Sequence, residues 1–90
     1  MLKIRYSSKF KKDYKTIVKR GYDQAKFKKV LTMLCNQKEL PRELCDHQLK
    51  GDYMGHRECH IQPDWLLIYK IEDDILTLTL TRTGSHSDLF

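Results

Sequence analysis

The sequence predicts an α+β domain with the order β-α-α-β-β-β, in which a helical hairpin packs on a curved, mainly antiparallel sheet. Two observations carry this prediction. Two consecutive segments of the first half have apolar residues at helical spacing, whereas residues 56–82 form short apolar or alternating runs separated by polar turns. The length of 90 residues fits one domain, so we expect a single unit over residues 1–90.

A short strand and two helices are predicted first. Residues 1–6 alternate loosely between apolar and basic side chains, which is typical of a strand. Ser7 or Ser8 is a suitable N-cap for a helix that Gly21 ends. Asp23 can cap the second helix. Each helix has one apolar stripe, formed in the first by Phe10, Tyr14, Ile17 and Val18 and in the second by Phe27, Val30, Leu31 and Leu34.

Three strands are predicted after a loop. Pro41 bars continuation of the second helix, and a loop covers residues 39–52. Strand-like runs then cover residues 56–61, 65–71 and 75–82, and their short connections imply an antiparallel meander. A break at residues 83–85 leaves a tail from residue 86 to 90. Helices on one face would leave the other face of the sheet open for a ligand.

The charge is unevenly distributed along the chain. Residues 1–38 hold twelve Lys or Arg against two Asp or Glu, whereas residues 39–90 hold five against ten and contain all four histidines. The first part therefore suits a polyanionic partner, unless its lysines only form solvated helix faces. The sequence has no apolar run long enough for a membrane span and no signal-peptide pattern, so we expect a cytoplasmic location without a membrane partner.

Several residues have the chemistry of metal-free RNA cleavage. Such cleavage needs a base for the 2′-hydroxyl, an acid for the departing 5′-oxygen and cations for the phosphate. Imidazole serves as base or acid near neutral pH, and the arginine fork suits a phosphate. The candidates are His47 in the loop, His60 at a strand end, Asp64 in the following turn, Arg82 on the last strand and His86 beyond it. Whether they converge stays open at this stage.

Strand alternation adds a geometric expectation. Side chains two positions apart share a face, so Glu58 and His60 should lie on the open face when Cys59 and Ile61 lie under the helices. Metal binding is the rival chemistry, because Cys45, His47, Cys59 and His60 supply ligands. Their spacing lacks the separated pairs of zinc sites, so we expect neither metal nor cofactor. The three cysteines form no disulfide framework and no nucleophile signature.

Three ordered blocks of the chain resemble a known family. Residues 46–51 (DHQLKG), 57–69 (RECHIQPDWLLIY) and 82–90 (RTGSHSDLF) are similar to the corresponding motifs of YafQ-type toxins of the RelE/ParE superfamily. The resemblance implies a RelE/ParE-like fold and the toxin of a type II toxin–antitoxin pair. It also implies an endoribonuclease that cleaves mRNA in the 30S A site of the ribosome, and a DinJ/RelB-like antitoxin as partner.

The resemblance also implies site residues. His86 matches the proton donor to the leaving oxygen, and His47, His60 and Asp64 match the remaining catalytic positions, with the identity of the base unsettled. Arg82 matches a phosphate contact, and Phe90 matches an aromatic residue that helps to place a base. We expect further RNA contacts, including ribosomal RNA, from basic residues of the first helix and the strand region: Lys9, Lys11, Lys12, Lys15, Lys50 and Arg57.

Two other functions are compatible with this fold. One is a ParE-like topoisomerase poison, against which the histidine and aspartate set speaks, because such a protein needs no acid–base groups. The other is a non-catalytic RNA-binding or interaction module, which the basic helices would suit. Alanine at His86 separates the module from the nuclease, because it would leave only the module's effect intact.

Overall fold

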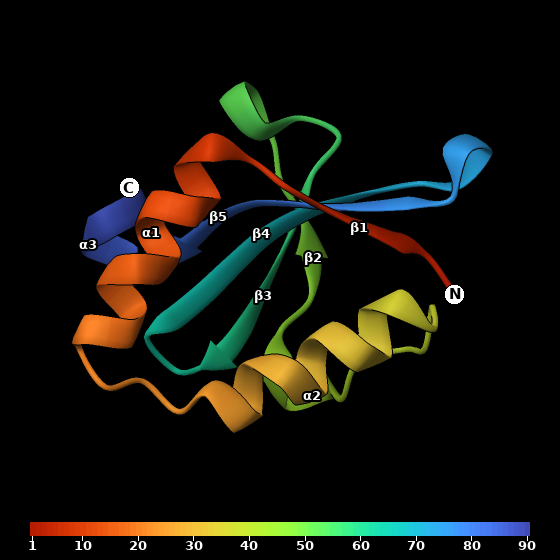
Figure 1. Cartoon of the computed structure of the whole chain (residues 1–90). Coiled ribbons are helices and arrows are strands. Elements are labelled where there is room, and N and C mark those ends of the chain that lie inside the picture. Colours follow the sequence, from red (N-terminus) through yellow and green to blue (C-terminus); the bar gives the residue numbers. More distant parts are fainter.

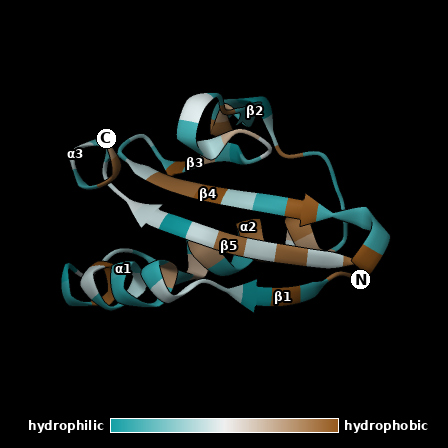
Figure 2. Ribbon diagram, turned by 90° about the horizontal axis from the view of Figure 1, so that it is seen from above, coloured by the Kyte–Doolittle hydropathy of each residue, from teal (hydrophilic) through white to brown (hydrophobic).

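The computed structural model describes residues 1–90 as a five-stranded sheet with two longer helices against it (Figure 1). The strands are β1 (Lys3–Tyr6), β2 (His47–Gln48), β3 (Arg57–Gln62), β4 (Trp65–Glu72) and β5 (Thr77–Gly84). They lie in the order β1-β5-β4-β3-β2, as Figure 2 shows from above. β1 is parallel to β5 and every other pair is antiparallel, which confirms the predicted α+β class and mainly antiparallel sheet.

Both longer helices begin where the sequence predicts. In α1 (Ser8–Lys19) the side chain of Ser7 accepts a hydrogen bond from the backbone N–H of Phe10 at 2.9 Å. In α2 (Gln24–Cys35) the carboxylate of Asp23 accepts from the N–H of Ala25 at 3.0 Å. These caps satisfy backbone donors that have no partner inside a helix. None of the helices combines the length and hydrophobicity that a membrane-spanning helix requires.

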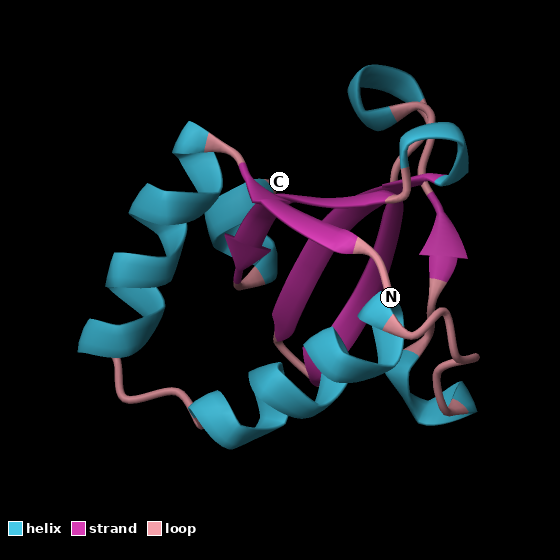
Figure 3. Ribbon diagram, turned by 45° about the vertical axis from the view of Figure 1, so that its right-hand side comes forward, coloured by secondary structure: helices cyan, strands magenta, loops and turns pink.

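The two helices diverge after their short connection rather than lying side by side along their length (Figures 1 and 3). α1 packs against β5, whereas α2 packs near β3. Large aromatic rings occupy the space between them: Phe27 lies 6.1 Å from Phe10, 5.2 Å from Tyr14 and 6.4 Å from Trp65, between ring centroids. The hairpin is therefore opened by the size of its own apolar residues. Val18, expected in the buried stripe, is 44% exposed.

Both faces of the sheet are covered at its centre. Between the sheet and the helices lies one core of 15 buried residues, which includes Cys59, Leu67 and Tyr69. Leu66 and Ile68 alternate with these residues and lie outside that core, yet both are 0% exposed. The rings of Tyr53 and Phe90 meet at 6.3 Å, so the segments before β3 and after β5 meet across the sheet. The face that the sequence leaves open is thus partly covered.

The structure differs from the sequence prediction in the loops and at the chain's end. The loop over residues 39–52 contains β2 and two short 3-10 turns, Arg42–Leu44 and Gly51–Tyr53. β5 starts only at Thr77, because Asp73–Ile75 form a third such turn and Leu76 has a left-handed backbone (φ 48°). Residues 83 and 84, predicted as a break, continue β5, and the tail forms the helix α3 (His86–Leu89).

Candidate active site

The sheet register brings the predicted histidines to one face. His47 of β2 pairs with Glu58 of β3, Glu58 with Ile68 of β4, and Ile68 with Arg82 of β5. Directly paired residues share a face, so His47, Glu58 and Arg82 form a row across the sheet. One step along, His60 pairs with Leu66, which pairs with Gly84. Two strand spacings, roughly 10 Å, therefore separate the backbones of His60 and Gly84, just before His86.

Glu58 lies between two imidazoles. One of its carboxylate oxygens is 3.7 Å from Nε2 of His47 and 3.5 Å from Nε2 of His60. The residue is only 4% exposed, so the expectation that Glu58 looks out into solvent is wrong. Glu58 is buried because β3 lies between β2 and β4, and β2 covers Glu58 from one side. A buried carboxylate with two imidazoles beside it can hold or accept a proton within this cluster.

His47 is oriented by a backbone contact. Its Nδ1 lies 2.7 Å from the carbonyl oxygen of Cys45, so Nδ1 must carry the proton that is donated. Its other ring nitrogen, Nε2, faces the carboxylate of Glu58. These two contacts orient the ring of His47 toward the carboxylate of Glu58.

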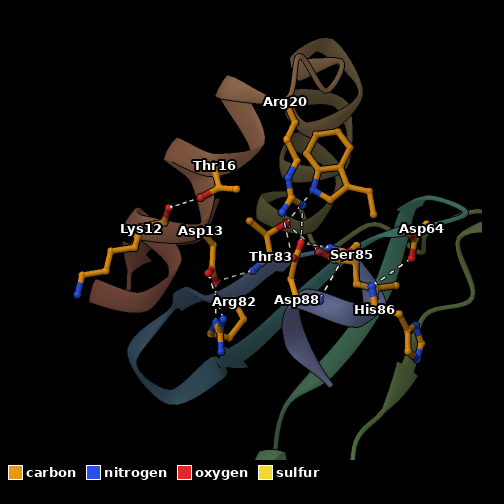
Figure 4. A network of polar contacts seen from close by, with 12 residues as sticks. Lys12, Asp13, Thr16, Arg20, Asp64, Arg82, Thr83, Ser85, His86 and Asp88 are labelled. Atoms are coloured by element: carbon orange, nitrogen blue, oxygen red, sulfur yellow. Dashed lines mark hydrogen bonds and ion pairs between the residues drawn. The ribbon is translucent and has the colours of Figure 1, made fainter.

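His86 is the first residue of α3, and its side chain is exposed. The backbone N–H of His86 donates to a carboxylate oxygen of Asp64 at 3.1 Å, so the turn between β3 and β4 contacts the start of α3 (Figure 4). The ring of His86 lies 5.5 Å from the ring of Phe90. Asp64, His86 and Phe90 therefore lie close together at one end of the sheet. A shared site needs this proximity.

A capping box shapes the first turn of α3. The hydroxyl of Ser85 accepts from the N–H of Asp88 at 3.2 Å, and the carboxylate of Asp88 accepts from the N–H of Ser85 at 2.8 Å. Gly84 is needed beside it: its φ is 155°, and a Cβ at this position would lie 2.9 Å from a carboxylate oxygen of Asp88. The side chain of Asp88 thus folds back over the end of β5.

Arg82 is already engaged by α1. Its Nε and Nη2 donate to the two carboxylate oxygens of Asp13 at 2.6 and 3.1 Å, and the N–H of Thr83 donates to the same carboxylate at 3.2 Å (Figure 4). Hydrogen bonding to Asp13, with a smaller contribution from Tyr53, raises the pKa of Arg82. The ion pair leaves Nη1 as the group of Arg82 that can turn to a phosphate.

Arg57, predicted as an RNA contact, instead forms an ion pair inside the protein. It alternates with Glu58 along β3 and therefore lies on the face that the helices cover. Its guanidinium donates to both oxygens of Asp46, which also accepts from the hydroxyl of the buried Tyr69 at 2.5 Å. The contact with Asp46 raises the pKa of Arg57. Arg57 thus anchors the residue before His47 and does not reach the histidine face.

The predicted lysines are all solvent-exposed. Four of them lie on α1, which lies at the same end of the sheet as α3 (Figure 2), and the fifth precedes the turn at Gly51: Lys9, Lys11, Lys12, Lys15 and Lys50. None of these lysines forms an ion pair. They are therefore free to meet phosphates.

The cysteines lie apart from this chemistry. Cys59 is fully buried on the helix side, opposite His60, as strand alternation predicts, and burial raises its pKa to about 12. Cys35 is buried, Cys45 is exposed, and all three thiols are free. No group of three or more His, Cys, Asp or Glu side chains has metal-binding geometry.

Sequence reasoning missed three residues of this region. Glu58 was placed on the correct face but given no role, because its burial depends on β2, which the sequence does not reveal. Tyr53 was given no role, although its ring contacts Phe90. Asp88 was an unassigned position of the tail, and the Ser85-x-x-Asp88 spacing of a capping box was the signal that could have identified it.

Comparison with known proteins agrees with the fold. The model of the YafQ toxin family, described as a bacterial toxin of type II toxin–antitoxin systems, matches residues 2–90. The mRNA interferase toxin YafQ of Escherichia coli is 43% identical over 88 residues, which are 97% of this chain and 94% of that protein.

Solved structures of toxins share the complete fold. A metal-bound toxin from Helicobacter pylori superposes with a TM-score of 0.93 at 47% identity, covering 100% of both chains. YafQ in the E. coli DinJ–YafQ complex superposes with a TM-score of 0.89 at 42% identity, covering 100% of this chain and 99% of the other.

The match over residues 2–90 assigns this small α+β protein to the toxins of type II toxin–antitoxin systems. Within that class, the chain belongs to the YafQ family. Curated members of this family are named mRNA interferases.

Proposed function

We propose that this toxin is a ribosome-dependent mRNA interferase, which cleaves mRNA in the ribosomal A site by acid–base catalysis without a metal ion. The observation that carries the proposal is the cluster of His47, Glu58 and His60 on one face of the sheet, together with the bond between Asp64 and the backbone of His86 at the end of β5. Two separate proton-transfer groups, one on β3 and one on α3, are what cleavage by a 2′-hydroxyl requires.

His86 is the proposed acid. It stands on an exposed helical turn, where it can approach the leaving 5′-oxygen, and no carboxylate contacts its ring. The pair Glu58–His60 is the proposed base, because a buried carboxylate next to an imidazole can take a proton from the 2′-hydroxyl directly or through His60. Each of these groups contributes about 10²–10⁴-fold to the rate.

Positive charge around these groups holds the RNA. His47 and Nη1 of Arg82 face the scissile phosphate, and Phe90 supports a base of the messenger. Backbone phosphates of ribosomal RNA are bound by Lys9, Lys11, Lys12, Lys15 and Lys50. Such contacts weaken as salt rises, so we expect ribosome binding to fall steeply with ionic strength.

The site is shallow, which accounts for a requirement for the ribosome. The groove of about 500 Å³ in this chain lies between α1 and α2, away from the histidines. Free RNA would meet an open surface and rarely adopt in-line geometry, whereas the A site presents the phosphate in a fixed pose. In cells, a DinJ/RelB-like antitoxin would silence the toxin, as the DinJ–YafQ complexes of E. coli relatives suggest.

The test is cleavage of a defined mRNA on programmed ribosomes by the wild-type toxin and by His86→Ala, each dialysed against EDTA beforehand, so that the Mg²⁺ of the ribosome buffer is the only divalent ion added. A single A-site cut that falls by about 100-fold or more in His86→Ala, with ribosome binding unchanged, supports the proposal. Ser87→Ala is the matched control, since Ser87 is the exposed neighbour of His86, and it should cut like the wild type.

Three outcomes contradict parts of the proposal. Equal cutting by wild type and His86→Ala removes His86 from the chemistry. Fast cutting of naked transcripts removes the ribosome requirement. Loss of cutting after the toxin alone is dialysed against EDTA, with recovery when a transition-metal ion is added back to the toxin, removes metal independence. Binding without any cutting indicates a non-catalytic module.

A further inference from the structure

A second contact joins α1 to the end of the chain, 68 residues away in sequence. Nη1 and Nη2 of Arg20, the C-cap of α1, donate to the two carboxylate oxygens of Asp88 at 2.6 and 3.1 Å. Figure 4 shows the side chain of Arg20 reaching from its helix to Asp88 below the indole of a neighbouring side chain. Two parallel hydrogen bonds fix the orientation of both groups, not only their distance.

Asp88 transmits this contact to the backbone of α3. The carboxylate oxygen that takes the shorter bond from Arg20 also accepts the N–H of Ser85, and Ser85 in turn caps the N–H of Asp88. A helix of four residues has no stability of its own, so its place depends on contacts to the rest of the protein. Two side chains outside the final β5–α3 segment contact this turn. Arg20 binds Asp88 inside the turn, and Asp64 accepts the N–H of its first residue, His86.

His86 depends on that turn for its position. Its imidazole is exposed and its one ring contact is Phe90, which belongs to the same end of the chain. A rotation of α3 would therefore move His86 and Phe90 together, and the contact of Phe90 with Tyr53 is the one ring contact that links this pair to the segment before β3. Displacement of a catalytic group by about 1 Å can cost up to 10²-fold in rate.

We propose that Arg20 is a positioning residue for His86, acting through Asp88 and Ser85, and is not an RNA-binding cation like Lys9, Lys11, Lys12 and Lys15 of the same helix. This inference rests on the proposed role of His86 in mRNA cleavage. Arg20 touches no reacting atom: it fixes the carboxylate, the carboxylate fixes the capping box, and the capping box fixes the helical turn that carries the acid. Hydrogen bonding to Arg20 and to the backbone of Ser85 holds the pKa of Asp88 well below its usual range, so the contact is present throughout the working pH range.

The exposure of this ion pair separates positioning from stability. The side chain of Arg20 is 40% exposed and that of Asp88 is 30% exposed, and exposed pairs contribute little to folding. Removing the pair should therefore leave the protein folded and loosen only α3. A structural role would show in the melting temperature, whereas a positioning role shows in the rate at saturation.

The experiment compares Arg20→Ala, Asp88→Asn and their double variant in single-turnover cleavage on programmed ribosomes. We expect each single variant to lower the saturated rate about tenfold, with little change in the half-saturating concentration. The double variant should be no slower than either single variant, because both remove the same contact. Arg20→Lys, which keeps the charge but loses the two-pronged contact, should recover only part of the rate.

Lys19→Ala is the matched control, because it removes one exposed charge from the same end of α1 without touching Asp88. It should leave the saturated rate unchanged. Equal losses in Lys19→Ala and Arg20→Ala, or losses that multiply in the double variant, would overturn the proposal and make Arg20 an ordinary cation of the basic helix.

An activity-independent readout separates this inference from the proposed function. Backbone ¹⁵N relaxation should show greater mobility of residues 86–89 in Arg20→Ala than in the wild type, and no change in Lys19→Ala. If residues 86–89 become more mobile in Arg20→Ala but the wild-type toxin does not cut mRNA, the proposed function is wrong and the positioning role of Arg20 on α3 stands. If the wild type cuts mRNA but relaxation is unchanged in Arg20→Ala, the positioning role alone is wrong.

Discussion

Two arginine–aspartate pairs join α1 to the C-terminal segment with nearly the same geometry and different burial (Figure 4). In Arg82–Asp13 the side chains are 20% and 15% exposed, whereas in Arg20–Asp88 they are 40% and 30% exposed. Both pairs have two hydrogen bonds, of 2.6 and 3.1 Å. The first acts at the end of β5, and the second acts on α3.

The difference in burial separates two tasks. Asp13 is screened from water and also accepts the backbone N–H of Thr83, so its loss leaves several donors without partners. Asp88 lies in solvent, where water can replace a lost partner at small cost. The inner pair, Arg82–Asp13, therefore holds α1 on the sheet. The outer pair, Arg20–Asp88, positions the helical turn α3 without being needed for folding.

The largest expected effect is that of Asp13→Ala on stability. The variant leaves the half-buried guanidinium of Arg82 and the N–H of Thr83 unpaired, so we expect a loss of about 2–3 kcal/mol in the free energy of unfolding. Urea denaturation measures it. Asp23→Ala is not a suitable control, because it removes a helix cap, whereas Asp52→Ala removes an exposed acid without a partner and should change stability by less than about 0.5 kcal/mol.

If Asp13→Ala costs no more than Asp52→Ala, burial does not distinguish the two pairs. The variant should also lower mRNA cleavage, because Arg82 loses the carboxylate that orients it.

A smaller effect is expected from Tyr69→Phe, which tests a third contact of the same kind. The hydroxyl of Tyr69 donates to Asp46, and Tyr69 itself is 1% exposed. The variant keeps the ring and the Arg57–Asp46 pair and removes one hydrogen bond, so stability should fall by about 1 kcal/mol. Urea denaturation at pH 7 checks this, and a loss as large as that of Asp13→Ala would show that Asp46, not Asp13, is the more important carboxylate.

The sequence was sufficient for most of the fold, because the elements have local signals. Ser7 and Asp23 cap the helices as expected, and the alternation of Cys59 with Glu58 and His60 places the faces of β3 correctly. β2 escaped prediction because two residues are too few for a period. The divergence of the helices depends on how Phe10, Tyr14 and Phe27 pack, which spacing does not determine.

The candidate site residues could be proposed from the sequence, but the contacts that support them could not. The histidines and Asp64 were proposed from motifs and chemistry, and the register brings His47 and His60 to one face. The partners of the arginines were not identifiable, since Asp13 is 69 residues from Arg82 and a charged helix residue has many candidate partners. Arg57 was assigned to RNA for the same reason: sequence shows a cation, but not the carboxylate of Asp46 beside it.

Thiol labelling gives a local measure of how differently the Arg82–Asp13 and Arg20–Asp88 pairs affect the stability of the core. Cys59 lies 0% exposed under the sheet, and its burial-raised pKa of about 12 keeps it unreactive until the core opens, whereas Cys45 is exposed. If Asp13→Ala costs 2 kcal/mol, labelling of Cys59 at pH 8 should accelerate by roughly 30-fold, at about 1.4 kcal/mol per tenfold. Mass spectrometry of the labelled peptide should show no acceleration in Arg20→Ala, and an equal acceleration there would place the outer pair in the core's stability.

The smallest expected effect is the acid dependence of the outer pair. Because Arg20 lowers the pKa of Asp88 in the folded protein below its ordinary 3.8, ionisation of Asp88 favours folding above that value and the contribution is lost as pH falls through the folded pKa. The stability difference between wild type and Asp88→Asn should thus be constant from pH 7 to about pH 4.5 and shrink only below about pH 3.8. Across roughly pH 5–9 the Arg20–Asp88 contact stays intact. A bell-shaped dependence of the cleavage rate on pH in this range therefore reports the pKa values of the catalytic acid and base. A difference that vanished between pH 7 and pH 5 would show that a histidine, and not Asp88, controls the position of α3.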